Sequence, residues 1–273
     1  MSGIAVSTEY AIWPAVCQEA SAEIAREPIL AGFLHTTVLK HDSLESSLSF
    51  HLAGKLGSES LPSILLRELI DDTMAADRRI GRSILADLQA VHDRDPASHG
   101  YLTPFLYFKG FHALEAYRIA HWLWNQGRCV LAVHVQNRIS EVFGADIHPA
   151  ARLGSGILID HGTGVVIGET AVVENNVSLL HEVTLGGTGK QSGDRHPKVR
   201  EGVLIGAGAK VLGNVEIGAG AKIGAGSVVL DPVPPHRTVA GVPARIVGTP
   251  HTGAPALEMD QSIPHIFTDG SGI

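Results

Sequence analysis

The sequence has few cysteines, no long apolar run and no excess of positive charge. Its two cysteines in 273 residues, Cys17 and Cys129, lie too far apart for a metal-binding pair. No stretch approaches the roughly 18 apolar residues of a membrane-spanning helix, and the N-terminus lacks the basic and apolar segments of a signal peptide. A net charge of −7 argues against nucleic acid as the main partner. These absences predict a cytoplasmic protein with reduced thiols that binds neither membranes nor nucleic acids.

Aromatic residues are almost missing from the second half of the chain. Thirteen of the 14 Phe, Trp and Tyr residues lie at or before Phe143, and only Phe267 follows. A narrow, tightly wound interior accommodates Val, Ile, Leu and Ala more readily than aromatic rings. The sequence therefore predicts a boundary near Gly144, with a first domain over residues 1–143.

The first 143 residues carry apolar side chains at helical spacing, and Pro28 and Gly57 are placed where helices would stop. This domain is predicted to be α-helical. The expected helices cover residues 9–26, 29–40, 44–56, 63–76, 79–92, 103–127 and 130–143. The segment 103–127 is apolar enough to be a core or interface helix.

Aliphatic residues return every six positions in two runs of the second half. The runs are Ile147, Leu153, Ile159, Val165, Ala171, Val177 and Val183, and then Val199, Ile205, Val211, Ile217, Ile223 and Val229. A helix repeats at about 3.6 residues and a strand at about 2, so a period of six fits neither. It is typical of hexapeptide β-helix repeats, each one short strand plus a turn. Three repeats make a coil of about 18 residues with the aliphatic residues stacked inside.

The turn positions of the second run support this fold. Three residues after each aliphatic residue comes glycine or asparagine, the residues that best tolerate positive φ: Gly202, Gly208, Asn214, Gly220 and Gly226. A β-helix is therefore expected over residues 144–250, where several prolines end it. The tail 251–273 is rich in Gly, Pro, Ser and Thr and is expected to be flexible in part.

His161 is a candidate general base. It stands between an aspartate and a glycine, and Asp146 precedes it by fifteen residues. With coils of about 18 residues, His161 and Asp146 are expected to come close on adjacent coils. A carboxylate that holds one ring nitrogen leaves the other free to act as a base. An idle surface histidine is the alternative.

The two aliphatic runs are out of phase, so an insertion lies between them, from Gly186 to Lys198. Function often concentrates on loops that a rigid scaffold holds. This loop carries Asp194, Arg195 and His196, and its arginine is a candidate for binding a carboxylate. A solvated loop with ordinary charges explains the same residues equally well.

Several motifs together resemble those of bacterial serine O-acetyltransferases, and the resemblance runs essentially from end to end. The motifs are RDPA at Arg94–Ala97, KGFHALEAYRIAHWLW at Lys109–Trp124, DIHPAARLGSG at Asp146–Gly156, DHGTGVVIGETA at Asp160–Ala171, VTLGGTGK at Val183–Lys190, GDRHPKVR at Gly193–Arg200 and AGVPARIVG at Ala240–Gly248. The resemblance implies an α+β fold, with an α-helical N-terminal domain, a left-handed parallel β-helix with one inserted loop, and a C-terminal tail. It also implies trimers that join through the helical domains into a hexamer.

The resemblance further implies transfer of acetyl from acetyl-CoA to the hydroxyl of L-serine, the first step of cysteine biosynthesis from serine. His161 would be the general base and Asp146 its orienting partner. The serine amino group would be held by Asp95 and Asp160. Arg195 would bind the serine carboxylate, and His196 would lie beside the substrate.

Acetyl-CoA is expected as a co-substrate in a groove between neighbouring β-helices, with no permanently bound cofactor and no metal. The resemblance suggests contacts with the pantetheine arm and phosphates from Gly187, Ala207, Ala225, Lys222 and Arg245. It also implies that L-cysteine inhibits at the serine site. The C-terminal Ile273 would dock into the next enzyme, O-acetylserine sulfhydrylase.

Three other readings remain open on the residues alone. One is an acetyltransferase of the same repeat fold that acts on a sugar, antibiotic or amine. Another is a zinc hydratase on a β-helix, although its usual pair of histidines about five residues apart is missing here. The third is a purely structural scaffold, which would leave His161 and the inserted loop unexplained.

Overall fold

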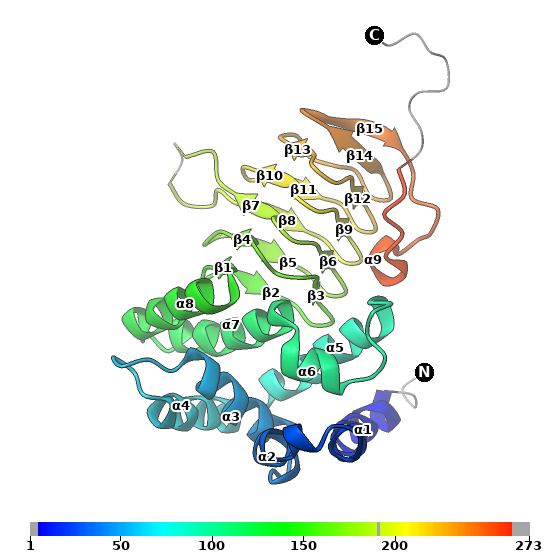
Figure 1. The fold of residues 1–273 in the computed structure, drawn as a ribbon. Helices are drawn as coiled ribbons and strands as arrows, with labels where there is room; N and C mark the ends of the chain where they lie inside the picture. The colour runs from blue at the N-terminus through cyan, green and yellow to red at the C-terminus, as the bar shows by residue number, and fades with distance from the viewer. Residues whose placement is uncertain (1–4, 190–191, 264–273) are drawn as a thin grey trace.

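The computed structural model describes residues 5–189 and 192–263. Helices fill one end of the molecule and a stack of short strands the other, as Figure 1 shows. The helices are α1 (Ala5–Arg26), α2 (Ala31–Leu34), α3 (Leu44–Leu56), α4 (Ser63–Ala76), α5 (Arg78–Arg94), α6 (Leu102–Tyr107), α7 (Lys109–Asn125), α8 (Cys129–Phe143) and α9 (Pro255–Glu258).

The predicted helices of the first part are found, with two corrections. Residues 44–56 and 63–76 are helical over the expected ranges. The expected helix at 29–40 is instead a 3-10 turn (Pro28–Leu30), α2 and a π-helical turn (His35–Leu39), in which the Lys40 N–H bonds to the carbonyl of His35.

The single long helix expected over 103–127 is wrong, because the chain bends at Phe108 into α6 and α7. Phe108 is extended (φ −78°, ψ 105°). The bend brings the start of α7 against the first β-coil, where a Cβ on Gly110 would lie 2.0 Å from the carbonyl oxygen of Ile159. Only glycine allows this approach, so the helix break is set by packing against a distant segment.

The strands form a three-faced parallel coil, which confirms the left-handed β-helix with its helical N-terminal part. Face 1 is β1-β4-β7-β10-β13, face 2 is β2-β5-β8-β11, and face 3 is β3-β6-β9-β12-β14-β15, whose last strand is antiparallel. The strands are β1 (Asp146–Ile147), β2 (Arg152–Leu153), β3 (Leu158–Ile159), β4 (Val166–Ile167), β5 (Val172–Val173), β6 (Ser178–Leu179), β7 (Thr184–Gly186), β8 (Lys198–Val199), β9 (Leu204–Ile205), β10 (Lys210–Leu212), β11 (Glu216–Ile217), β12 (Lys222–Ile223), β13 (Val228–Val229), β14 (Thr238–Gly241) and β15 (Ala244–Gly248).

The six-residue step holds in the second run but shifts inside the first. Val199 through Val229 all lie buried in strands, as predicted. In the first run, Ile159 is in β3, whereas Val165 precedes β4 and Ile167 takes the strand position. The first coil is therefore longer, since Asp146 pairs with Val166, twenty residues on. The two extra residues fall in the turn that contains His161.

Four of the five predicted turn residues have the expected positive φ, and Asn214 does not. Gly202, Gly208, Gly220 and Gly226 have φ between +64° and +71°. The third repeat of this run uses Gly213 (φ +94°) in place of Asn214, because β10 continues to Leu212 and leaves a corner of only three residues, 213–215.

One hydrophobic core runs from the helices into the coil, from Ile12 to Val239. Among the described helices, none is long and apolar enough to cross a membrane.

The chain after β15 returns along the β-helix, and α9 lies beside it near α5 (Figure 1). Ala256 is fully buried, and Ser178 Oγ donates to its carbonyl oxygen at 2.9 Å. The expected flexible tail is thus packed over its described part, which ends at Ile263. The predicted docking residue Ile273 lies outside the described residues.

Candidate active site

A cavity of about 880 Å³ lies where the end of α5, the start of α7, the first coil and the C-terminal segment meet. Its walls include Asp95, Asp160 and His161, together with Lys109 and Met259. Three of the residues predicted to bind or activate serine therefore share one cavity, although Asp95 is 65 positions from Asp160 in the sequence.

Local backbone geometry projects these side chains into the cavity. Asp95 caps the C-terminus of α5, and its N–H bonds to the carbonyl of Val91. His161 stands in the lengthened turn, residues 160–165, with φ +58°, and about 70% of its side chain is exposed. Gly162 follows with φ +73°, and a Cβ there would lie 2.8 Å from Gly110 Cα. The start of α7 thus fixes this turn from behind.

The electrostatics of the cavity suit a cationic group and a base. Asp160 Oδ2 lies 3.7 Å from His161 Nε2. Burial raises the pKa of Asp160, and the nearby Asp95 charge adds to this, while His161 and His181 oppose it. A ligand ammonium between the two carboxyls would relieve their repulsion. Lys109, which lines the cavity, donates a hydrogen bond to Thr163 Oγ1 in the His161 turn.

The expected contact between His161 and Asp146 is not present within one chain. Asp146 begins β1 on face 1, and its Oδ1 accepts a hydrogen bond from Gln136 Nε2 at 2.6 Å. The one carboxylate paired with the His161 ring in the described chain is Asp160. The extra residues in the first coil displace His161 relative to the position assumed from an 18-residue coil.

Arg195 and His196 lie at a different corner. The His161 corner is the stack of turns from face 3 to face 1, residues 160–165, 180–183, 206–209 and 224–227. The Arg195 corner is the stack from face 1 to face 2, residues 148–151, 168–171, 187–189, 192–197 and 213–215. Face 1 separates the two corners. Within the described chain, no hydrogen bond or ion pair joins His161 with either Arg195 or His196.

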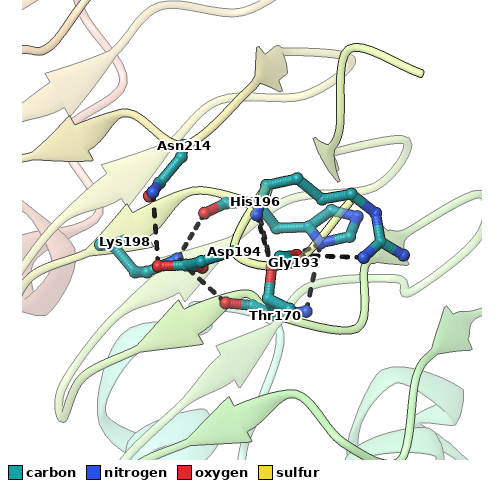
Figure 2. A network of polar contacts seen from close by, with 7 residues as sticks. Thr170, Gly193, Asp194, His196, Lys198 and Asn214 are labelled. Carbon is teal, nitrogen blue, oxygen red and sulfur yellow. Dashed lines mark hydrogen bonds and ion pairs between the residues drawn. The ribbon is translucent and has the colours of Figure 1, made fainter. Parts of the chain in front are cut away.

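The inserted loop is anchored on Thr170 (Figure 2). Thr170 Oγ1 accepts from the backbone N–H groups of Arg195 and His196 at 3.0 and 3.1 Å. Lys198 Nζ donates to Asp194 Oδ1 at 2.6 Å and to the Thr170 carbonyl at 3.0 Å. Residues 194–198 of the loop are therefore anchored to the coil by hydrogen bonds.

The orientation of His196 follows from its contacts. The buried ring fits under Gly168, where a Cβ would lie 2.1 Å from it. The Thr170 N–H donates to His196 Nδ1 at 3.1 Å, so in the neutral ring Nε2 carries the hydrogen and remains a donor for a ligand. Burial lowers the pKa of His196, and the neighbouring Arg195 lowers it further.

The Arg195 guanidinium is held by Glu169, with Nη2 to Oε2 at 2.7 Å, and this hydrogen bond lowers the pKa of Glu169. Asp146 belongs to the same electrostatic neighbourhood. Burial lowers the pKa of His148, Glu169 and Asp146 raise it, and Arg195 lowers it. The pKa of His148 therefore responds both to Asp146 and to the charges of Glu169 and Arg195.

The residues predicted to hold acetyl-CoA divide between the corners. Ala207 and Ala225 lie on the His161 corner, where the Gly226 N–H bonds to the Ala207 carbonyl and the Gly208 N–H to the His181 carbonyl. Gly187 lies on the Arg195 corner, where a Cβ added to it would lie 3.5 Å from His196 Nε2.

The two predicted phosphate ligands lie in different surroundings. Arg245 is exposed on β15, 3.8 Å from Asp231. Lys222 is only 2% exposed, and its Nζ donates to the carbonyls of Asp260 and Ser262. Lys222 therefore holds the chain's own C-terminal segment and is not free to bind phosphates in this arrangement.

No group of three or more His, Cys, Asp or Glu side chains gathers as metal ligands would within the part of the chain that the structure describes. The expectation that the protein uses no metal stays a prediction.

Comparison with known proteins decides the family. Residues 12–116 match the N-terminal region of serine acetyltransferases, and residues 196–231 match the six-repeat bacterial transferase hexapeptide family. The serine acetyltransferase of Escherichia coli (strain K12) is 59% identical over 265 residues, which cover 96% of this chain and 97% of that protein. The chain belongs to the serine acetyltransferase family.

Solved serine acetyltransferases also share the fold. One, in complex with cysteine, is 55% identical with a TM-score of 0.91 and covers 93% of this chain and 99% of its own. Another, from Brucella abortus strain S19 in complex with coenzyme A, is 53% identical with a TM-score of 0.87, covering 88% and 96%. The predicted family, fold, acyltransferase class and serine O-acetyltransferase activity are confirmed, and the hydratase and scaffold alternatives are excluded.

Sequence reasoning missed several residues around the candidate site. Thr170 and Glu169 organise the inserted loop, and Gln136 holds Asp146. His181 lies against His161, with ring centroids 5.7 Å apart. His161 and His181 are twenty residues apart, which equals the length of the first coil. This spacing is the sequence signal from which their contact could have been predicted.

Proposed function

We propose that the protein transfers acetyl from acetyl-CoA to L-serine at a site that two copies of the chain complete. The observation that carries this is the separation of the predicted serine ligands onto two corners. Asp95, Asp160 and His161 share one cavity, whereas Arg195 and His196 lie across face 1. A ring of three copies would bring the His161 corner of one against the Arg195 corner of the next.

The same arrangement explains why His161 and Asp146 do not meet within one chain. Asp146 lies on face 1 and shares its electrostatic environment with the Arg195 corner. We therefore assign Asp146 as the carboxylate that orients His161 of the neighbouring copy, after it exchanges its bond from Gln136 for the imidazole. A carboxylate on one ring nitrogen fixes the tautomer and leaves the other nitrogen as the base.

In the reaction, Asp95 and Asp160 bind the serine ammonium, and Arg195 binds the carboxylate. His161 removes the hydroxyl proton as serine Oγ attacks the thioester carbon. The tetrahedral intermediate collapses with cleavage of the C–S bond, and the imidazolium returns the proton to the thiolate of CoA. General acid–base catalysis of this kind contributes about 10²–10⁴-fold. Serine attacks directly, so no acyl-enzyme is needed.

Acetyl-CoA is the donor, and its arm runs along the groove between copies. The small residues Ala207 and Ala225 lie on the His161 corner one above the other, and Gly187 lies on the opposite corner. We keep these three as contacts of the pantetheine arm and Arg245 as the exposed phosphate ligand. Lys222 is left out because it is bound to the C-terminal segment.

L-Cysteine is the proposed inhibitor at the serine site, because it has the same ammonium and carboxylate for Asp95, Asp160 and Arg195. The thiol would take the place of the reacting hydroxyl. The relative solved with cysteine supports this proposal.

The domains have separate roles in this proposal. Residues 1–143 join two trimers into a hexamer, residues 144–250 carry the transfer, and residues 251–273 form the tail. Ile273 at its end docks into O-acetylserine sulfhydrylase, and the cytoplasm is the proposed location. The protein is proposed to bind no nucleic acid and no membrane, consistent with its net charge of −7.

The deciding experiment measures CoA release from acetyl-CoA with L-serine, and with sugars and amines in parallel. Serine-dependent release that L-cysteine inhibits competitively with serine is the expected result. His161→Ala should lower turnover by about 10²-fold or more while the oligomer stays intact. Release with a sugar but not with serine would overturn the substrate, and full activity of His161→Ala would overturn the base.

A further inference from the structure

One wall of the cavity that holds Asp95, Asp160 and His161 is the segment between α5 and α7, of which residues 95–98 and 107–109 line the cavity. The segment contains only the short helix α6, so its position depends on contacts with other parts of the chain. Resting on the proposed function, in which Asp95 binds the serine ammonium, we propose that Glu19 of α1 is a positioning residue for Asp95. Glu19 precedes Asp95 by 76 positions and is not among the residues that line the cavity.

The Glu19 carboxylate holds two consecutive backbone N–H groups at the start of α6. Its Oε2 accepts from the Leu102 N–H at 2.8 Å, and its Oε1 accepts from the Tyr101 N–H at 3.1 Å. The first N–H groups of a helix have no acceptor within the helix. A hydrogen bond to a charged acceptor is roughly twice as strong as one between neutral groups. Glu19 therefore fixes the place at which α6 begins.

Hydrogen bonds continue from the start of α6 back to Asp95. The buried Ser98 donates through Oγ to the Gly100 carbonyl at 2.8 Å, and Gly100 directly precedes Tyr101. The Ser98 N–H donates to the Asp95 carbonyl at 2.9 Å. Asp95 and the residues that Glu19 holds are thus joined by two short hydrogen-bonded turns. A shift at the start of α6 is therefore transmitted to Asp95.

The side chain of Asp95 takes its orientation from the same segment. Its Oδ1 accepts from the Ala97 N–H at 2.8 Å, which leaves Oδ2 for the serine ammonium. The carboxylate therefore moves with Ala97, and Ala97 lies inside the turn that Ser98 closes. A misplacement of about 1 Å at a reacting site can cost about 10²-fold in rate. The binding of serine should thus depend on a contact made outside the cavity.

Gly100 leaves room for the Glu19 carboxylate. A Cβ added to Gly100 would lie 2.6 Å from Glu19 Oε2 and 2.7 Å from Oε1. The carboxylate is the end of a flexible side chain, so an alanine at position 100 would push it away from the two N–H groups. Gly100→Ala therefore breaks the same contact without changing Glu19 itself.

The first variant is Glu19→Ala. We expect the KM for serine to rise about tenfold, with the KM for acetyl-CoA unchanged and kcat within about threefold of the wild type. The inhibition constant of L-cysteine should rise by the same factor as the serine KM, because both ligands present an ammonium to Asp95. Glu23→Ala is the matched control, since Glu23 lies one turn further along α1 and pairs only with the exposed Arg26 in the described chain.

Gly100→Ala provides the second variant and carries the test if Glu19→Ala fails to assemble. It should raise the serine KM as Glu19→Ala does. The double variant should have the serine KM of Glu19→Ala alone, because no carboxylate is left for the alanine at position 100 to displace. Effects of the two substitutions that multiply would overturn the inference.

Wild-type activity with serine tests the proposed function separately, because its absence would remove that function whatever the variants do. With wild-type activity present, an unchanged serine KM in Glu19→Ala overturns the inference. A lower melting temperature with equal rises in the KM values for serine and acetyl-CoA also overturns it, since Glu19 would then only stabilise the helical part. A rise confined to serine and L-cysteine, absent in Glu23→Ala, supports it.

Discussion

The guanidinium of Arg118 in α7 is buried against the carboxylate of Asp87 in α5, and both are tied to the first β-coil. Arg118 donates through Nε at 2.9 Å to Asp87 Oδ2 and through Nη2 to the Gly154 carbonyl at 2.8 Å. Asp87 Oδ1 accepts from the Ile157 N–H at 2.7 Å. This contact joins α5, which Asp95 caps, to the coil that carries His161.

Glu115 completes the cluster, and its burial beside Asp87 favours the protonated form. It is fully buried, and neither of its oxygens has a hydrogen-bond partner, although Oε2 lies 3.2 Å from Arg118 Nε. Burial raises its pKa well above the usual range, and the charge of Asp87 adds to this. With Glu115 protonated, the cluster holds one positive charge on Arg118 and one negative charge on Asp87.

Replacing Asp87 should therefore lower the free energy of unfolding far more than replacing Glu115. Glu115→Gln replaces a neutral acid by a neutral amide, and we expect a change in unfolding free energy below about 1 kcal/mol. Asp87→Asn leaves the Arg118 charge unpaired and should cost about 3–5 kcal/mol. Chemical denaturation measures both, and equal destabilisation by the two variants would show that Glu115 is ionised.

Mixed oligomers should test whether two copies share one site. Neither the His161→Ala nor the Asp146→Ala variant should be active alone. Random mixing by co-expression leaves about a quarter of the sites with both residues intact, so about a quarter of wild-type turnover should return. A site complete within one chain would give no recovery, and separately purified variants mixed without subunit exchange serve as the control.

The stability of the helical part should fall in mild acid. Burial lowers the pKa of His51 to about 4 and that of His112 to about 3. Their folded-state pKa values lie below the ordinary value near 6.5, so the unfolded chain takes up protons first as pH falls. The two neutral histidines therefore contribute fully to the free energy of unfolding above about pH 6.5. This contribution is lost toward pH 4, by about 2–4 kcal/mol for each histidine.

Thermal melting between pH 7.5 and pH 4.5 measures this loss. A His112→Gln variant cannot titrate and should show a shallower decline than the wild type, whatever its stability at pH 7.5. The matched His99→Gln variant, at an exposed position, should keep the wild-type slope. If the melting temperature of His112→Gln falls with pH as steeply as that of the wild type, groups other than His112 cause the loss of stability in acid.

Lys222→Met should release the C-terminal segment. The buried ammonium holds the carbonyls of Asp260 and Ser262, and methionine fills the space without donating. Hydrogen exchange over residues 255–263 should quicken by about tenfold or more. The KM for acetyl-CoA should stay unchanged, whereas a large rise in this KM would return Lys222 to the phosphate role expected from the sequence.

Removal of Ile273 should abolish binding to O-acetylserine sulfhydrylase and leave serine acetylation intact. The reason is that the proposed docking uses the chain end, far in sequence from His161. Calorimetry with purified sulfhydrylase measures the loss, and Ile273→Val is the conservative control. Unchanged affinity after the deletion would contradict the docking role.

Periodic, locally encoded features were predictable from the sequence. The ranges of α3 and α4 and the buried positions from Val199 to Val229 follow from side chains that repeat with the backbone. The residues Asp95, Asp160 and His161, which the motifs predicted to bind or activate serine, line one cavity, and their roles stay predictions. Each of these follows from pattern or from motif identity and needs no knowledge of how distant segments meet.

The tertiary structure alone decided how the corners are shaped and what meets there. Two extra residues in the first coil, the break at Phe108, the contact of His181 with His161 and the burial of Lys222 all arise where the chain packs against a distant part of itself. A six-residue period sets which side chains point inward, but not where a turn lengthens. The sequence by itself determined the β-helix and its family, and the close packing of turns, helices and tail determined the geometry of the site.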